Sequence, residues 1–339
     1  MTKDEKSNSK TQAVIWIVDS AYTGELNARI GVAERLGHPY EVIPLPNGDA
    51  LGYAQMLKGR YASHSKGSNP KLLIISGTGE ETTAEIADLK LLFEDRQILN
   101  VYLASILPDE LPPRLCEYDL IASPQLNGAN IVSLLGVPHK LTRDTLAIAY
   151  RQHEDYFGAL PKPIIGLLIG GNTRYCDGFN EAHAAGLAQR VAKIARSQEG
   201  CLVVTNSRRT PASAQAALLD ELEGLSYYFF DWRQIDLSFY HALLAHADLL
   251  IVSGDSLSMC SEAAYTGKPV LVDLSDTATE RYHREIVGKL VDYGAIKLLT
   301  DSYEPWTYVP PDSVGAVAGA IRAWLDGVSD GDATQQCSL

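Results

Sequence analysis

Short apolar runs alternate with longer segments of mixed polarity along most of the chain. Runs rich in Val, Ile and Leu are typical of strands buried in a parallel sheet, and apolar residues at helical spacing indicate helices between them. The predicted strands are 13–18, 40–43, 72–75, 101–104, 120–122, 164–169, 201–205, 227–230, 248–252 and 270–272. The predicted helices are 26–36, 83–93, 181–197, 212–222, 237–247 and 313–325.

Strands that alternate with helices in this way predict an α/β protein with parallel sheets wound by crossover helices. The alternation runs as two series with a proline-containing break at 161–163. A chain of 339 residues is also longer than a single hydrophobic core usually organises. We therefore predict two Rossmann-like lobes. The expected division is a disordered tail at 1–11, an N-terminal lobe at 12–157, a C-terminal lobe at 158–327 and a disordered tail at 328–339.

A polar turn after the strand 248–252 is the most informative local feature. Asp255 and Ser256 lead into a helix that carries Ser258 in its first turn and Glu262 further along. The unpaired N–H groups and the dipole of a helix N-terminus bind anions, and Glu262 could reach a ribose hydroxyl beside such an anion. The alternative is a helix cap followed by a solvated glutamate.

Two more loops qualify because ligands of parallel sheets bind beyond the carboxyl ends of the strands. One follows the strand 164–169 and contains a glycine pair, which could let a ligand approach the backbone or could be an ordinary tight turn. The other carries two arginines, which could clamp a diphosphate or could pair with Asp231 or Asp255. The residues of the two loops that we predict to bind this ligand are Gly171, Asn172, Thr173, Ser207, Arg208 and Arg209.

The N-terminal lobe offers weaker candidates. Asp19 and Glu25 lie in the loop after the first strand, where either could be a general base or could cap the next helix. The segment Ser76-Gly77-Thr78-Gly79 lacks the third glycine of a dinucleotide fingerprint, so NAD binding is not expected.

The composition of the chain limits which classes of binding partner and which cellular location we expect. A net charge of −13 disfavours nucleic acid and anionic membranes as the main partner, and no apolar run is long enough to span a bilayer, although peripheral association stays open. The polar start carries no secretion signal, and five scattered cysteines are typical of reduced thiols. The eight histidines show no metal-ligand spacing. We expect a cytoplasmic protein without metal or cofactor.

Three motifs make the chain recognisable: Leu168–Thr173, Thr205–Pro211 and Asp255–Ala263. In this order they resemble the Elm-type mitochondrial fission family, whose bacterial members are predicted nucleoside-diphosphate-sugar epimerases. The likeness runs from about Ile15 to Leu299. The family in turn resembles the GT-B glycosyltransferases. That resemblance implies two facing Rossmann-like lobes, a donor nucleotide on the C-terminal lobe and no required metal.

The first lobe departs from the family pattern. The loop after Asp19 has no lysine or histidine, and an acidic run ending in Glu80 and Glu81 stands where relatives carry an arginine. The C-terminal lobe, which would hold the donor nucleotide, keeps the family motifs. The N-terminal lobe, which would hold the acceptor, departs from them.

The resemblance implies a glycosyltransferase that moves a sugar from a nucleoside-diphosphate sugar to a hydroxyl acceptor, such as an envelope or capsule glycan or a small metabolite. Two alternatives stay open. The chain could be a non-catalytic nucleotide-binding or partner-recruiting protein, as the family's link to mitochondrial division suggests. It could also be a nucleotide-sugar epimerase that uses Glu25, Glu80 and Glu81 around the sugar.

Overall fold

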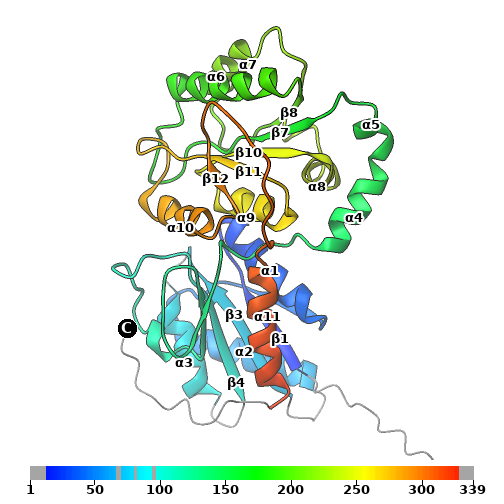
Figure 1. The fold of residues 1–339 in the computed structure, drawn as a ribbon. Helices are drawn as coiled ribbons and strands as arrows, with labels where there is room; N and C mark the ends of the chain where they lie inside the picture. The colour runs from blue at the N-terminus through cyan, green and yellow to red at the C-terminus, as the bar shows by residue number, and fades with distance from the viewer. Residues whose placement is uncertain (1–12, 66–69, 80–81, 94–96, 328–339) are drawn as a thin grey trace, which may run out of the picture. The chain divides into compact units, whose positions relative to one another are not determined.

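A computed structural model of the chain describes residues 13–65, 70–79, 82–93 and 97–327, which divide into two compact units (Figure 1). Unit 1 holds the described residues up to 134 together with residues 314–327, and unit 2 is the stretch 135–313. Each unit contains one six-stranded sheet in which all the described strand pairs are parallel. The predicted fold class of two wound parallel sheets is confirmed.

The sheet of unit 1 has helices on both faces. Its strands are β1 (Ala13–Val18), β2 (Tyr40–Ile43), β3 (Lys71–Gly77), β4 (Ile98–Leu103), β5 (Leu120–Ser123) and β6 (Ile131–Ser133), in the order β2-β1-β3-β4-β5-β6. Its helices are α1 (Thr23–Leu36), α2 (Ala50–Ser65), α3 (Thr83–Leu92) and α11 (Ser313–Leu325), with a short 3-10 turn at Leu115–Glu117. Side chains alternate across β1, so Trp16 packs with α2 and α3 while Ile15 packs with α1 and α11.

The last helix, α11, belongs to unit 1. Its residues Val317 and Ile321 are fully buried in the same cluster as Val32 of α1, and Figure 1 shows the two helices side by side. The ammonium of Lys71 donates to the carbonyl oxygens of Trp324 (2.8 Å) and Leu325 (2.9 Å), which neutralises the C-terminal end of the helix. The sequence analysis assigned this helix to the C-terminal lobe, and its apolar face is buried in the other unit.

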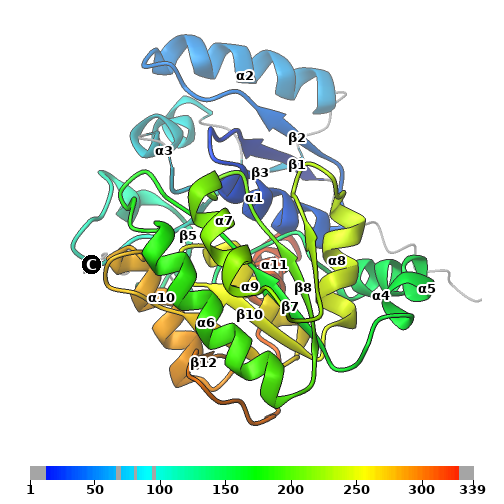
Figure 2. The same cartoon turned by 90° about the horizontal axis from the view of Figure 1, so that it is seen from above.

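Unit 2 is built in the same way. Its strands are β7 (Ile164–Leu168), β8 (Cys201–Thr205), β9 (Tyr227–Phe230), β10 (Leu249–Ser253), β11 (Val270–Asp273) and β12 (Lys297–Leu298), in the order β12-β11-β10-β7-β8-β9. Its helices are α4 (Arg143–Gln152), α5 (Glu154–Gly158), α6 (Glu181–Ser197), α7 (Ala212–Glu221), α8 (Leu237–His246), α9 (Leu257–Thr266) and α10 (Arg281–Asp292). Helices α6 and α7 cover one face, and α8, α9 and α10 cover the other (Figure 2).

The expected boundary at 157/158 falls inside unit 2. Leu146 of α4 and Phe157 of α5 are buried in one cluster with Leu243 of α8. The ring of His246 stacks on Tyr150 at 3.9 Å and on Phe157 at 4.8 Å. The two helices before the proline-containing break therefore complete the core of unit 2, and the chain passes between the units at 134/135 instead.

Several elements were not among the predictions: helices α2, α4, α5 and α10 and strands β6 and β12. The two tails expected at 1–11 and 328–339 lie outside the described residues. Cys116, Cys176, Cys201 and Cys260 are free thiols. Among the described residues, no helix combines the length and the apolar character that crossing a bilayer requires.

Candidate functional site

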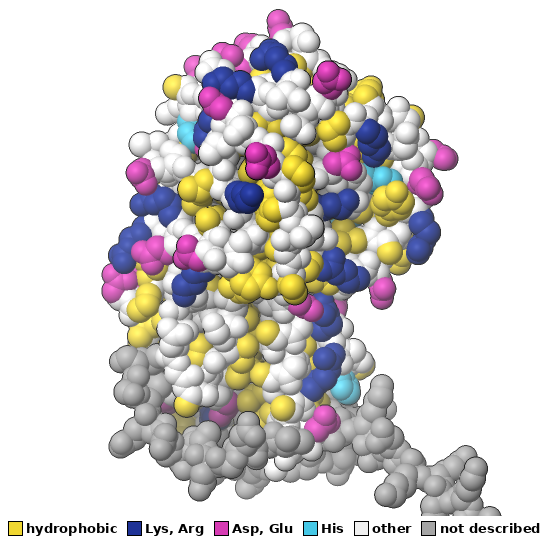
Figure 3. All heavy atoms as spheres, viewed as in Figure 1, with side chains coloured by type: hydrophobic (Ala, Val, Ile, Leu, Met, Phe, Trp, Pro, Cys, Tyr) yellow, Lys and Arg dark blue, Asp and Glu magenta, His cyan; other side chains and the backbone are white. Residues whose placement is uncertain are grey.

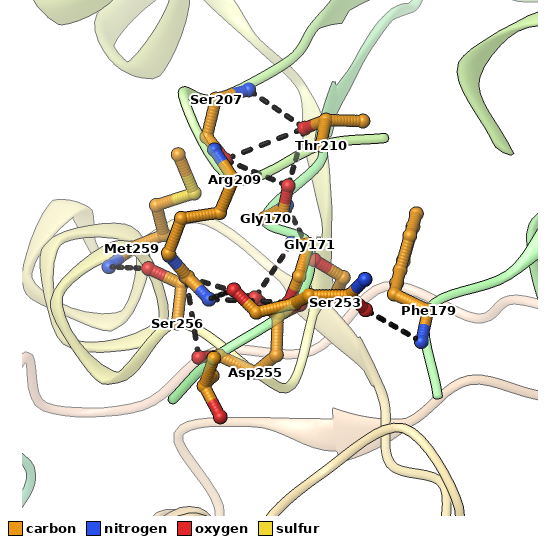
Figure 4. A network of polar contacts seen from close by, with 12 residues as sticks. Gly170, Gly171, Phe179, Ser207, Arg209, Thr210, Ser253, Asp255, Ser256 and Met259 are labelled. Carbon is orange, nitrogen blue, oxygen red and sulfur yellow. Dashed lines mark hydrogen bonds and ion pairs between the residues drawn. The ribbon is translucent and has the colours of Figure 1, made fainter. Parts of the chain in front are cut away.

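Three loops of unit 2 meet at the carboxyl ends of the neighbouring strands β10, β7 and β8 (Figure 4). The N–H of Gly170, after β7, donates to Ser253 Oγ at the end of β10 (2.7 Å). The N–H of Gly171 donates to Asp255 Oδ2 (2.7 Å), and Ser207 Oγ, after β8, donates to the carbonyl of Gly170 (2.7 Å). The structure therefore brings together the three loops that the sequence analysis singled out in this half of the chain.

The glycine pair is needed because the loops touch each other. A Cβ on Gly170 would overlap the Asp255 carboxylate, and one on Gly171 would overlap the Arg209 carbonyl. Gly171 also has φ +149°, a backbone conformation that favours glycine. Next to it, Asn172 Oδ1 accepts a hydrogen bond from the N–H of Phe179 (3.0 Å). Close packing between protein loops is thus sufficient to explain both glycines.

Arg209 ties the β8 loop to the other two loops. Its Nη1 donates to the carbonyls of Gly171 and Asn172, both at 3.1 Å. Its Nη2 pairs with Asp255 Oδ2 at 2.9 Å and also contacts the Asp255 carbonyl. Figure 4 shows the side chain reaching across to the turn that contains Asp255. The alternative in which an arginine pairs with Asp255 therefore holds for Arg209, whose side chain stays 35% exposed.

Arg208 and Arg209 differ in their surroundings although they are adjacent in the chain. Arg208 is exposed. Asp231, the other carboxylate considered as a partner, is held by Arg233 at 2.8 Å. That contact holds the pKa of Asp231 well below its usual range. A ligand that approaches the site meets one arginine bound within the loop network and one on the surface.

Asp255 is a buried carboxylate, with 2% of its surface exposed. Burial raises its pKa, and the charge of Arg209 opposes that rise. The ion pair therefore offsets part of the cost of burying a carboxylate beneath the loops, and the pKa stays raised.

The N-terminus of α9 has backbone donors that the helix cap does not use. Ser256 caps the helix, because its Oγ accepts from the N–H of Met259 at 3.4 Å. The N–H groups of Leu257 and Ser258 form no hydrogen bond with any described residue, as expected for the first turn of a helix. Ser258 is partly exposed. Capping and anion binding are thus compatible here, since the cap uses the third N–H of the helix and leaves the first two.

Glu262 lies further along α9, partly exposed, and it is not simply a solvated residue. The hydroxyl of Tyr240, on α8, donates to its Oε2 at 2.7 Å. Burial raises the pKa of Glu262 to about 7, although the Tyr240 hydrogen bond lowers it. A group that titrates near neutral pH can exchange protons or change its charge when a ligand binds.

Two residues at the start of α10 join this site and were missed from the sequence. Thr173 Oγ1 donates to the carboxylate of Glu280. Burial raises the pKa of Glu280, and Arg209 opposes that rise. Burial and Arg209 together lower the pKa of His283 to about 3, so its ring is neutral. The signal was available: an amphipathic stretch follows Glu280, with Ile286, Val287 and Leu290 on its buried side.

The candidates in unit 1 lie at the carboxyl end of β1. Asp19 Oδ1 accepts a hydrogen bond from the N–H of Ser20 (2.7 Å), and Glu25 lies in the first turn of α1. Arg29, only 1% exposed, was missed, and it donates to the carbonyls of Val18 and Asp19, both at 2.7 Å. It also bonds the carbonyls of Gly77 and Thr78 after β3. Glu80 and Glu81 lie outside the described residues.

Charges on unit 2 are mixed on the face seen in Figure 3, where Lys and Arg side chains lie among Asp and Glu side chains. Among the described residues, no group of three or more His, Cys, Asp or Glu side chains is arranged to hold a metal ion. The face seen in Figure 3 shows no patch of a single charge among the described side chains of unit 2.

Two Rossmann-like units, each with a six-stranded parallel sheet, place the fold in the GT-B class. The chain belongs to the mitochondrial fission ELM1 family, whose model matches residues 23–325. It is 30% identical over 202 residues to the mitochondrial fission protein ELM1 of Arabidopsis thaliana, a match that covers 58% of this chain and only 46% of the plant protein. It is 24% identical over 348 residues to the uncharacterized protein RP120 of Rickettsia prowazekii, covering 91% of this chain and 97% of that protein.

Solved structures share the fold at low identity. The UDP-GlcNAc 2-epimerase of Methanocaldococcus jannaschii is 13% identical with a TM-score of 0.54, covering 93% of both chains. The UDP-GlcNAc 2-epimerase of Neisseria meningitidis bound to UDP-GlcNAc is 14% identical with a TM-score of 0.52, covering 93% of this chain and 92% of that one. These comparisons confirm the resemblance that the motifs indicated.

Proposed function

We propose that unit 2 binds the nucleoside diphosphate part of a nucleotide sugar. The observation that carries the proposal is the pair of N–H groups of Leu257 and Ser258, which have no acceptor among the described residues. They lie in the first turn of α9, directly after the turn whose Asp255 pairs with Arg209, and Glu262 follows on the same helix. A diphosphate suits such a helix N-terminus, and a carboxylate can bind ribose hydroxyls. The Neisseria structure of the same fold, which holds UDP-GlcNAc, supports the ligand class.

The proposed reaction is glycosyl transfer to a hydroxyl acceptor. The diphosphate leaves with an extra negative charge, and donors already in place at the α9 N-terminus and Arg209 stabilise it in the transition state. Phosphate oxygens compete with Asp255 for Nη2 of Arg209, while Nη1 keeps its two carbonyl acceptors. Asp19 or Glu25 takes the proton of the acceptor hydroxyl, as transfer to oxygen requires.

Epimerisation of the sugar is a second candidate, supported by one specific observation. Glu280 has a raised pKa, and it lies close enough to Arg209 for the positive charge of the guanidinium to oppose that rise. An acidic group of this kind can give or take a proton at a sugar carbon while the nucleotide leaves and returns. The two epimerases described above have the same fold.

Ligand binding is tested by thermal unfolding with nucleoside diphosphates and nucleotide sugars on the wild type, Glu262→Gln and Arg208→Ala. A ligand at about 100 times its Kd adds about 2.7 kcal/mol of stability, which moves Tm by several degrees. The proposal expects a shift for one nucleotide class that Glu262→Gln reduces. If no ligand shifts Tm at millimolar concentration, the nucleotide proposal is wrong and the non-catalytic alternative gains.

Turnover then separates the two reactions. The nucleotide sugar that binds is incubated with the protein, first alone and then with candidate hydroxyl acceptors, and sugar products are followed by NMR. Conversion of the sugar without an acceptor indicates epimerisation, whereas release of the nucleoside diphosphate only with an acceptor indicates transfer.

A further inference from the structure

One hydrogen bond links the proposed ribose-binding residue to a different helix. Tyr240 lies on α8 and Glu262 on α9, and the tyrosine hydroxyl donates to Glu262 Oε2 at 2.7 Å. Both side chains are partly buried. Glu262 Oε1 forms no hydrogen bond with any described residue. The two oxygens of this carboxylate therefore have different surroundings, and only one of them is available to a ligand.

Electrostatics keep the hydroxyl in the role of donor. Burial and the charge of Glu262 raise the pKa of Tyr240, so the phenol stays protonated at neutral pH. The same hydrogen bond lowers the pKa of Glu262, which burial otherwise raises. Tyr240 thus favours the ionised carboxylate, the form that accepts two hydrogen bonds from hydroxyl groups.

We propose that Tyr240 is a positioning residue that orients the Glu262 carboxylate so that Oε1 accepts a hydrogen bond from the ribose 2′-hydroxyl, which makes the site selective for ribonucleotides over 2′-deoxyribonucleotides. The inference rests on the nucleotide-binding function proposed above. Without the tyrosine hydroxyl, Glu262 can rotate about its side-chain bonds, and fixing it again on binding costs conformational entropy.

The test compares Tyr240→Phe with Tyr308→Phe. The first change removes only the hydroxyl that holds Glu262. The second is a matched control, because the Tyr308 hydroxyl also contacts the opposite end of α9. Its single hydrogen is shared between the carbonyls of Ala264 in the last turn (2.9 Å) and Lys268 just after the helix (2.7 Å). Isothermal titration calorimetry measures the binding of ADP, CDP, GDP and UDP and of their 2′-deoxy forms to the full chain.

We expect the wild type and Tyr308→Phe to bind one ribonucleoside diphosphate about tenfold more tightly than its 2′-deoxy form, as a hydrogen bond to a charged group allows. Tyr240→Phe should lose most of that ratio through weaker ribonucleotide binding, with 2′-deoxynucleotide binding unchanged. An unchanged ratio in Tyr240→Phe would overturn the inference. Equal losses in both tyrosine variants would also overturn it, because a general effect on α9 would then explain the result.

A second measurement does not require a ligand. Carbon-13 NMR of labelled glutamate follows the titration of Glu262, assigned by its absence in Glu262→Gln. The pKa of Glu262 should be higher in Tyr240→Phe than in the wild type, and an identical titration would overturn the positioning role. If the wild type binds none of the nucleotides, the proposed function is wrong and this inference falls with it. Nucleotide binding with no effect of Tyr240 overturns the inference alone.

Discussion

Arg209 stabilises the contact among three loops because its guanidinium bonds two carbonyls and pairs with the buried Asp255. Arg209→Ala removes these donors and leaves Asp255 without its ion pair, so we expect the free energy of unfolding to fall by about 2 kcal/mol. Arg208→Ala removes the same charge from the exposed neighbouring residue, and it should change the free energy of unfolding by less than about 0.5 kcal/mol. Urea titration measures both variants, and similar losses would contradict the role assigned to Arg209.

Glu262 makes stability depend on pH. Its pKa is about 7 in the folded chain against an ordinary value of 4.5. The folded state therefore keeps a proton that the unfolded state releases, and the free energy of unfolding falls as pH rises from 4.5 to about 7. Glu262→Gln removes this effect, so the wild type should lose about 3 kcal/mol relative to the variant across that window. Denaturation at several pH values tests this, and parallel curves for the two proteins would refute it.

The sequence indicated which loops of unit 2 come together better than it indicated the contacts of their residues. Loops after buried strands share one edge of a sheet, so Gly171, Arg209 and Asp255 could be grouped without a structure. Their contacts could not be predicted, because which of two adjacent arginines turns inward depends on the backbone of the β8 loop. Tyr240 gave no signal, since its partner lies on a neighbouring helix 22 residues away in the chain.

At the scale of elements, the loop after β7 needs glycine where it contacts the β8 loop. A Cβ at position 171 would overlap the Arg209 carbonyl, and φ there is +149°. Gly171→Ala should therefore destabilise the chain by about 3 kcal/mol. Gly186 is the control, because it lies within α6 and a Cβ there meets nothing within 4 Å. Gly186→Ala should stabilise by about 0.5 to 1 kcal/mol. Thermal unfolding compares the two, and a mild effect at position 171 would show that the loops separate easily.

Buried strands were easier to predict than some helices for a physical reason. A strand such as β10 is buried on both faces, so its apolar run is visible by itself. Helix α4 is largely exposed, and only Leu146 and Ala149 of its ten residues are buried. Its place in the fold depends on α8, which comes much later in the chain. Local patterns therefore indicated the sheets, and tertiary contacts decided the helices at the unit boundaries.

At the scale of the molecule, the division into units predicts which fragment folds alone. Residues 135–313 contain α4 and α5 with the α8 surface that they bury, and they omit α11. This fragment should unfold cooperatively and give a dispersed NMR spectrum. A fragment spanning 158–327 exposes Leu243 and Leu244 of α8 and carries the apolar face of α11 without its partner, so it should aggregate or unfold at lower temperature. Equal stability of the two fragments would contradict the observed boundary.

The assignment of α11 to unit 1 has a consequence for biosynthesis. The ribosome makes β1 to β6 first, but the cluster around Ile15 and Val32 still lacks Val317 and Ile321 at that stage. Residues 135–312 of unit 2 leave the ribosome before that helix does. Unit 2 can therefore finish folding while the apolar face of unit 1 that α11 will cover is still exposed. A nascent chain that stops before α11 exposes this face, so the last stretch of translation protects the first unit from aggregation.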